Sequence, residues 1–149
     1  MSLVDQALSY VRSISPYQPG KPISELAREM GIPVDRIVKL ASNENPLGMS
    51  PKARRAVEAA ISGVERYPDQ FELIRAVAER CAVAQNQVVL GNGSNDVLDL
   101  IARVFLAPGR SAVFAQHAFA VYPLATLSTG AELIATPAKH YGHDLAAMR

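Results

Sequence analysis

The 149-residue sequence has a single cysteine, no tryptophan and almost no net charge. One cysteine, Cys81, excludes an internal disulfide and is typical of proteins that stay in a reducing compartment. The 15 basic and 14 acidic residues are mixed along the chain and leave a formal charge of +1. Because no basic stripe is present, we expect no nucleic-acid partner.

Long apolar runs are also absent. No stretch approaches the about 18 consecutive apolar residues that cross a bilayer, and Asp5 stands where a secretory signal would have its apolar core. Hydrophobic residues make up 49% and charged residues 19% of the chain, which is typical of an ordinary soluble globular protein. The sequence therefore predicts a cytoplasmic protein with no membrane partner.

Strands and helices are predicted to alternate in the second half of the chain. Short apolar runs at Gln87–Leu90, Ser111–Ala115 and Glu132–Thr136 predict strands, and helical patterns at Asn95–Leu106 and about 119–129 lie between them. Such alternation favours right-handed βαβ units. We therefore expect an α/β fold with a parallel βαβαβ sheet covered by helices.

Other signals are more local. In the helix predicted at Asn95–Leu106, one face is formed by Val97, Leu98, Ile101, Val104 and Phe105. Earlier in the chain we expect a helix from Ser24 to Met30, a short strand at Ile37–Ala41 and a helix that starts at Ser50 and Pro51.

The last residues, His143–Arg149, resemble the cap and first turn of a further helix. A parallel sheet of three strands would leave long edges uncovered. We therefore expect the chain to be the truncated N-terminal part of a longer protein, or to need a partner.

A glycine-rich turn, "GNGSND" at residues 91–96, joins the first predicted strand to its helix. It is not an ATP-binding Walker A loop, because no lysine followed by serine or threonine comes after the second glycine. A dinucleotide loop is disfavoured, because Asp96 replaces the third glycine and the next strand ends without the acid expected about 20 residues later.

A simpler phosphate site remains at this turn. Backbone N–H groups of Gly93, Ser94 and Asn95, with the Ser94 hydroxyl, open a helix whose positive dipole end favours an anion. The alternative is that Asn95 or Asp96 serves as an ordinary helix cap with no ligand. The turn alone does not decide between these two interpretations.

Four segments together make the sequence resemble the histidinol-phosphate aminotransferases, pyridoxal-phosphate (PLP) enzymes of fold type I. They are "SPYQPGKP", "KLASNENPLGMSPKA", "VERYPD" and "VVLGNGSNDVLDLIARVFLAPG" followed by "QHAFAVYP", and the likeness runs from Ser15 onward. The resemblance implies an N-terminal arm and small-domain segment at residues 1–48, and the first part of the PLP-binding large domain at residues 49–149.

The resemblance also implies roles for single residues. Gly93, Ser94 and Asn95 match the turn that holds the cofactor phosphate. Phe119 matches the aromatic residue that stacks on the pyridine ring, where the family often has tyrosine; a core aromatic at a helix start is the alternative. Tyr67 matches a tyrosine that reaches the phosphate of the other subunit of a homodimer; the alternative is a surface tyrosine before Pro68.

Three further positions match the substrate pocket. Tyr17 matches a residue near the phosphate end of the substrate, and Asn43 and Asn45 match the loop that lines the pocket. The two asparagines are equally well explained as turn formers ahead of Pro46. The sequence departs from the family at residues 117–119, where His-Ala-Phe replaces Pro-Thr-aromatic.

The implied function is transamination between histidinol phosphate and 2-oxoglutarate in histidine biosynthesis. The alternatives are an aromatic aminotransferase, a threonine-phosphate decarboxylase-like enzyme, or a noncatalytic phosphate-binding fragment. No catalytic residue is expected in this chain, because its lysines do not match the Schiff-base lysine, which we expect beyond Arg149; they are Lys21, Lys39, Lys52 and Lys139. We also expect no metal site, since the pair His140 and His143 has no third ligand nearby.

Overall fold

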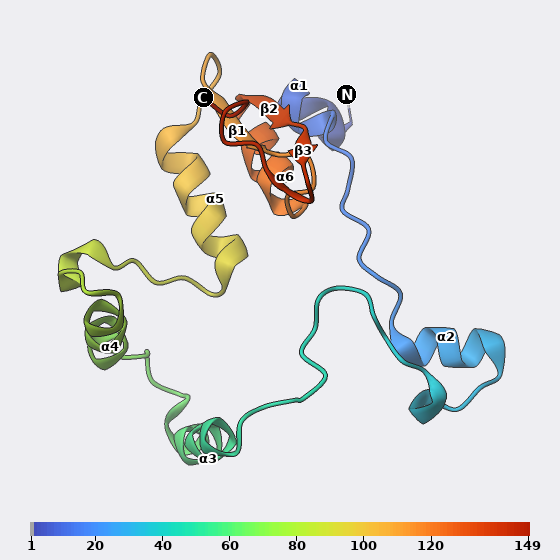
Figure 1. Cartoon of the computed structure of the whole chain (residues 1–149), viewed down its shortest axis with the longest axis vertical. Coiled ribbons are helices and arrows are strands. Elements are labelled where there is room, and N and C mark those ends of the chain that lie inside the picture. Colours follow the sequence, from blue (N-terminus) through green and yellow to red (C-terminus); the bar gives the residue numbers. More distant parts are fainter. Residues whose placement is uncertain (1) are drawn as a thin grey trace. The chain divides into compact units, whose positions relative to one another are not determined.

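A computed structural model describes residues 2–149 of the chain (Figure 1). The chain divides into two compact units. One unit joins residues 2–16 to residues 71–149, and the other is residues 17–70. The division after residue 48 that the resemblance implies stays a proposal. Within the described residues no helix is long and apolar enough to span a membrane.

The regular elements are mostly short. The α-helices are α1 (Ser9–Arg12), α2 (Ile23–Met30), α3 (Pro51–Ala60), α4 (Phe71–Cys81), α5 (Ser94–Phe105) and α6 (Val121–Ser128). The 3₁₀ turns are η1 (Leu3–Gln6), η2 (Val34–Arg36), η3 (Ile61–Gly63) and η4 (Gln85–Gln87). The strands are β1 (Ser111–Ala115), β2 (Glu132–Thr136), β3 (Ala138–Lys139) and β4 (Gly142–His143).

In the unit of residues 17–70, both predicted helices form, but α2 starts at Ile23 with Pro22 as its cap, so Ser24 lies inside the helix rather than at its start. Helix α2 is closed by Gly31, whose φ of 65° lies in the left-handed region that glycine adopts without strain. Helix α3 starts with Ser50, whose Oγ accepts a hydrogen bond from the Ala53 N–H at 3.3 Å, and with Pro51 in the first turn.

The short strand predicted at Ile37–Ala41 is wrong. Residues 37–40 follow η2 without regular structure, and no described segment pairs with them. A strand is defined by the hydrogen bonds of its ladder, so an apolar run without a neighbour stays an extended connection.

Strands β1 and β2 form a parallel pair joined by α6, which confirms two predicted strands at their predicted bounds. The register runs from Ser111 opposite Glu132 to Ala115 opposite Thr136. Beyond the last pair, the Gln116 N–H donates to the Thr136 carbonyl at 2.8 Å. This is the βαβ unit that the alternating pattern predicted.

The third predicted strand, Gln87–Leu90, is wrong. Gln87 ends η4, and Val88 is extended at φ −111° and ψ 124°, but no strand lies beside it within residues 2–149. The predicted βαβαβ sheet is therefore present as a single βαβ unit. The same holds for the segment that starts at Ile37: its backbone is extended, but no neighbouring strand among the described residues forms hydrogen bonds with it.

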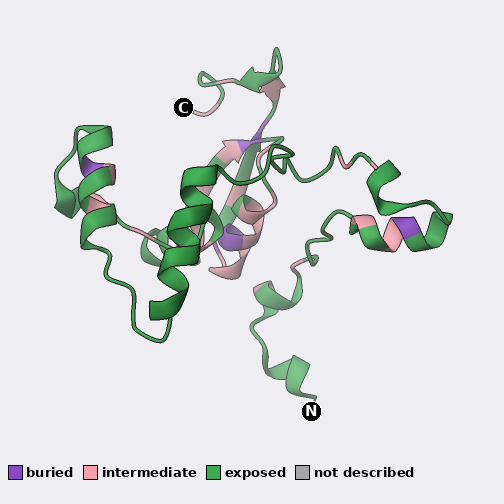
Figure 2. Cartoon of the chain, turned by 90° about the horizontal axis from the view of Figure 1, so that it is seen from below, coloured by how far each residue is buried: buried purple, intermediate pink, exposed green. Residues whose placement is uncertain are grey.

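Helix α5 buries only part of the apolar face that the sequence predicts. Ala102 is buried and lies with Leu98 against α6. The predicted apolar face forms but is not covered, because Val97, Ile101, Val104 and Phe105 line an open groove together with Val89. Val104 is 72% exposed, and Figure 2 shows most of α5 in the colour of exposed residues.

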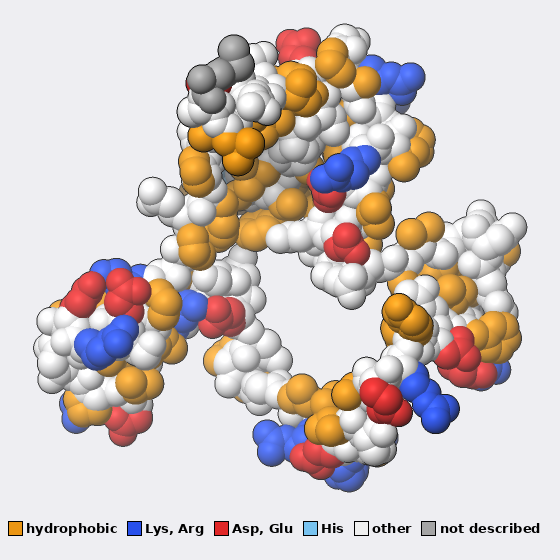
Figure 3. All heavy atoms as spheres, turned by 180° about the vertical axis from the view of Figure 1, so that it is seen from behind, with side chains coloured by type: hydrophobic (Ala, Val, Ile, Leu, Met, Phe, Trp, Pro, Cys, Tyr) orange, Lys and Arg blue, Asp and Glu red, His pale blue; other side chains and the backbone are white. Residues whose placement is uncertain are grey.

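The packed core is built from small side chains. Every buried apolar residue among those described is an alanine: Ala27, Ala78, Ala102, Ala115, Ala125 and Ala131. Larger apolar side chains remain at the surface, where Figure 3 shows them spread over both units. Alanines let α5 and α6 approach closely, but they bury little apolar area, so this core contributes modest hydrophobic stabilisation.

The last residues form a hairpin and a turn. Strands β3 and β4 are antiparallel, and His140 and Tyr141 between them have φ of 50° and 60°. Positive φ at two central residues is the geometry of a tight hairpin turn. The cap expected at the end of the chain is present, because the Asp144 Oδ1 accepts hydrogen bonds from two following amides, but no helix follows it within the described residues.

Candidate functional site

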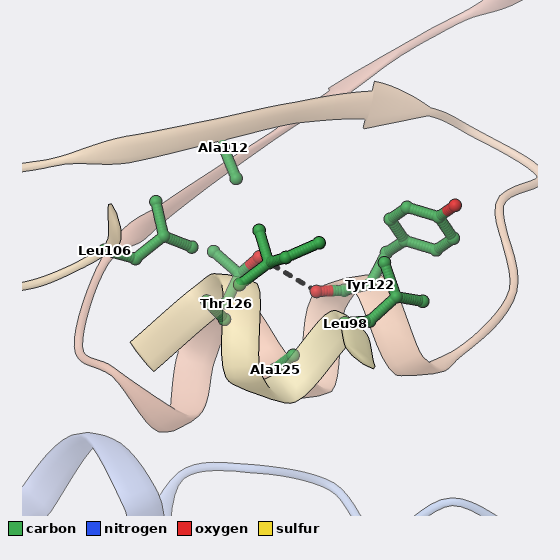
Figure 4. Close-up of a pocket in the computed structure, with 8 residues that line it drawn as sticks. Leu98, Leu106, Ala112, Tyr122, Ala125 and Thr126 are labelled. Carbon is green, nitrogen blue, oxygen red and sulfur yellow. Dashed lines mark hydrogen bonds between the residues drawn. The ribbon is translucent and has the colours of Figure 1, made fainter. Parts of the chain in front are cut away.

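The starts of α5 and α6 lie at the same end of the βαβ unit. A pocket of about 150 Å³ between the two helices and β1 has Leu98 and Tyr122 at one end and Leu106 and Ala112 at the other (Figure 4). Ala112 lies near the beginning of β1, so the first turns of both helices lie toward its carboxyl end. In open parallel sheets, this is the end at which ligands bind.

The glycine turn leads into α5 at that end. Gly93 has φ 90° and ψ 171°, a conformation that is essentially restricted to glycine. Its N–H donates to the Gly91 carbonyl at 2.9 Å, which closes a three-residue turn around Asn92. The Asn92 N–H donates to the Asp96 Oδ2 at 2.8 Å. The two amides before the helix are therefore both bonded inside the turn.

The amides of the first helical turn are left open. The N–H groups of Ser94, Asn95 and Asp96 have no acceptor among residues 2–149, because the first residues of a helix have no carbonyl one turn earlier. No side chain caps the helix, and a Cβ placed on Gly93 would meet nothing within 4 Å. Open amides, open space and the positive end of a 12-residue helix suit an anion such as a phosphate.

Phe119 lies between β1 and α6, at the same end of the unit. Its carbonyl accepts a hydrogen bond from the Tyr122 N–H at 3.0 Å, and α6 begins two residues later, at Val121. The helix expected from about residue 119 therefore starts slightly later than predicted. The side chain of Phe119 is 54% exposed.

The other four candidate residues belong to the unit of residues 17–70. Asn45 forms a local turn, because its Oδ1 accepts from the Leu47 N–H at 3.0 Å and its Nδ2 donates to the Gly48 carbonyl at 3.1 Å. Asn43 has φ 49°, a left-handed conformation that asparagine tolerates. Both observations support turn formation. Tyr17 is 48% exposed and Tyr67 is fully exposed.

Three of the four lysines of the chain are paired with carboxylates. The hydrogen bond from the Lys21 Nζ to Glu29, at 2.6 Å, raises the pKa of Lys21 above its usual value, and the nearby charges of Glu29 and Glu25 add to the rise. Lys39 is paired with Glu44 at 2.6 Å, and Lys139 with Asp144 at 3.8 Å. A nucleophilic lysine needs the opposite environment, one that lowers the pKa of its amine.

Two features of the site were missed in the sequence. One is the bond from the Asp96 carboxylate back to Asn92, which an acid in the first helical turn indicates only weakly. The other is a pocket of about 160 Å³ beyond β1, lined by His117 and by His143 from the hairpin. Nothing in the sequence indicates that the hairpin folds back toward the end of β1.

Comparison with solved structures defines the class of fold. The chain superposes on the crystal structure of histidinol-phosphate aminotransferase from Sinorhizobium meliloti in complex with pyridoxal-5'-phosphate, with a TM-score of 0.76 and 20% sequence identity. The match covers 96% of this chain and 38% of that one. The fold is therefore that of part of a PLP-dependent aminotransferase of fold type I.

Sequence comparison identifies the family. The family profile for aminotransferase class I and II matches residues 35–149, so the chain belongs to that family. It is 89% identical over 149 residues to histidinol-phosphate aminotransferase 1 of Dechloromonas aromatica, of which it covers 41%. It is 63% identical over 140 residues to histidinol-phosphate aminotransferase 2 of Pseudomonas aeruginosa, of which it covers 38%. The chain thus spans about two fifths of the length of these relatives.

Proposed function

We propose that this chain supplies the phosphate-binding part of a PLP-dependent histidinol-phosphate aminotransferase, a cytoplasmic enzyme of histidine biosynthesis. The observation that carries the proposal is the 89% identity over the whole chain to a protein of that name. The geometry supports it independently, because the open amides of Ser94 and Asn95 suit a phosphate.

The residues of the chain fit the cofactor. Glycine is the residue type that adopts the backbone conformation of position 93, with φ 90° and ψ 171°. The amides of Ser94 and Asn95, with the Ser94 hydroxyl, would hold the phosphate. The exposed part of Phe119 would cover one face of the ring. When bound, PLP draws electrons from the α-carbon of the amino-acid substrate. Tyr17, Asn43 and Asn45 remain the proposed substrate contacts.

The test of this function is a transamination assay on the complete polypeptide that contains this chain. With 2-oxoglutarate as acceptor, we expect kcat/KM for histidinol phosphate to exceed that for aromatic amino acids by at least about tenfold, since a buried charged contact to a substrate phosphate is worth about 1.5 to 3 kcal/mol. Equal rates with phenylalanine would contradict the histidinol-phosphate assignment but leave the aminotransferase assignment intact.

We further propose that the enzyme is a homodimer in which Tyr67 reaches the cofactor phosphate of the partner subunit. The complete exposure of Tyr67 supports this, because a large aromatic side chain in open solvent is available to a second protein. We expect Tyr67→Phe to weaken PLP binding by about tenfold through the loss of one hydrogen bond to a charged group. Tyr10→Phe is the matched control for the affinity measurement. Analytical sedimentation measures the oligomeric state, and a monomer at micromolar concentration would refute the homodimer.

A further inference from the structure

The carboxylate of Asp96 occupies an unexpected place in the glycine turn. It lies in the first turn of α5, yet its Oδ2 reaches back four residues to the Asn92 N–H at 2.8 Å. An acid at this position is usually explained by its attraction to the helix dipole. Here the carboxylate has a defined partner that lies outside the helix.

Gly91 shows how closely this carboxylate fits. A Cβ placed on Gly91 would lie 2.9 Å from the Asp96 Oδ2 and 2.8 Å from a methyl group of Val97. Such contacts are too short for real atoms, so a side chain at position 91 would displace the carboxylate or the start of the helix. Asp96 and Val97 both pack closely against Gly91, whose own φ is not positive.

The bond between Asp96 and Asn92 affects which amides of the turn are left open for a ligand. Asn92 is held by Asp96 and Gly93 by Gly91, so the two amides immediately before Ser94 are both bonded. With Asn92 released, Gly93 would be free to sample other conformations, since glycine has few steric restrictions. In the closed turn, the N–H groups of Ser94 and Asn95 remain open at the start of the helix.

We propose that Asp96 is a positioning residue for the cofactor phosphate: its carboxylate holds the 91–93 turn in the shape that aims the Ser94 and Asn95 amides at the anion. This inference rests on the proposed function. It contains a conflict of charge, because a carboxylate one turn from a phosphate also repels it. The hydrogen bond favours binding and the charge opposes it, and the two effects can be separated by substitution.

The experiment compares Asp96→Ala and Asp96→Asn in the complete polypeptide, with Asp99→Ala as the matched control. Asp99 lies one turn further along α5 and pairs with Arg103 at 2.6 Å, so its removal takes a negative charge from the same helix without touching the turn. The dissociation constants of PLP and of pyridoxal, which lacks the phosphate, are measured for each variant together with the Tm of the cofactor-free protein.

We expect Asp96→Ala to weaken PLP binding about tenfold, which corresponds to about 1.4 kcal/mol, and to change pyridoxal binding less than about twofold. Asp96→Asn keeps an acceptor for Asn92 and removes the charge, so its PLP affinity should equal or exceed that of the unmodified protein. Asp99→Ala should leave both constants unchanged. General destabilisation of the protein would weaken the binding of both PLP and pyridoxal. A loss of affinity for PLP alone therefore indicates an effect on the phosphate.

Several results would overturn the inference. Unchanged PLP binding in Asp96→Ala, or an equal gain in both Asp96 variants, would show that the carboxylate acts through its charge alone or not at all. Equal losses for PLP and pyridoxal would show a structural role without phosphate positioning. If the unmodified complete protein did not bind PLP, the proposed function would fail as well, so the two failures are distinguishable.

Discussion

Gly93→Ala is expected to weaken PLP binding more than any other single substitution in the turn. The residue has φ 90° and ψ 171°, and a side chain in this region costs about 1 to 3 kcal/mol. An alanine turn would relax to a different backbone shape in the free protein and would have to return to the strained one to bind phosphate. The dissociation constant of PLP should therefore rise by about 5- to 150-fold.

The measurement is a titration of the cofactor-free complete protein with PLP, followed by fluorescence. Gly109→Ala is the matched control, because Gly109 also has a positive φ, of 86°, but lies between α5 and β1 at the opposite end of the helix. Both variants should lose stability, and only Gly93→Ala should lose PLP affinity selectively over pyridoxal. Equal cofactor binding in the two variants would exclude Gly93 from the phosphate site.

The second large effect concerns the 149-residue chain produced by itself, which should show no detectable transamination. The reaction requires a lysine with a lowered pKa beside the cofactor. The pKa of Lys21 is raised instead by Glu29, while Lys39 and Lys139 are paired with carboxylates. The fourth, Lys52, lies exposed in the first turn of α3.

The corresponding measurement combines an activity assay with borohydride reduction in the presence of PLP and mass spectrometry of the products. We expect no stoichiometric labelling of any single lysine, only slow and scattered modification. Stoichiometric attachment to one of the four lysines, accompanied by turnover of histidinol phosphate, would contradict this expectation. The complete polypeptide is the positive control.

The parts of the fold that the sequence predicted correctly depend on neighbours in the chain. Strands Ser111–Ala115 and Glu132–Thr136 pair through a short crossover, so the apolar runs and the helix between them already specify the unit. Gln87–Leu90 and Ile37–Ala41 are equally apolar in pattern, but a strand also needs a partner, and no described segment pairs with either of them. The spacing of apolar residues predicts which face of a segment is buried, but it does not predict which other segment packs against that face.

The candidate site divides in the same way. Gly93 was predictable, because a glycine between an apolar run and a predicted helix indicates a backbone that other residues avoid. The bond from Asp96 to Asn92 was not, because it depends on the direction in which one side chain turns. Asn45 illustrates the opposite case, since its side-chain hydrogen bonds within the loop were one of the two interpretations that the sequence left open.

The most direct test of the central claim is a crystal structure of the complete polypeptide with PLP. We predict that phosphate oxygens accept hydrogen bonds from the N–H groups of Ser94 and Asn95 at about 2.7 to 2.9 Å, with the Asp96 carboxylate still bound to Asn92. A phosphate bound elsewhere, with only water at the start of α5, would contradict the account.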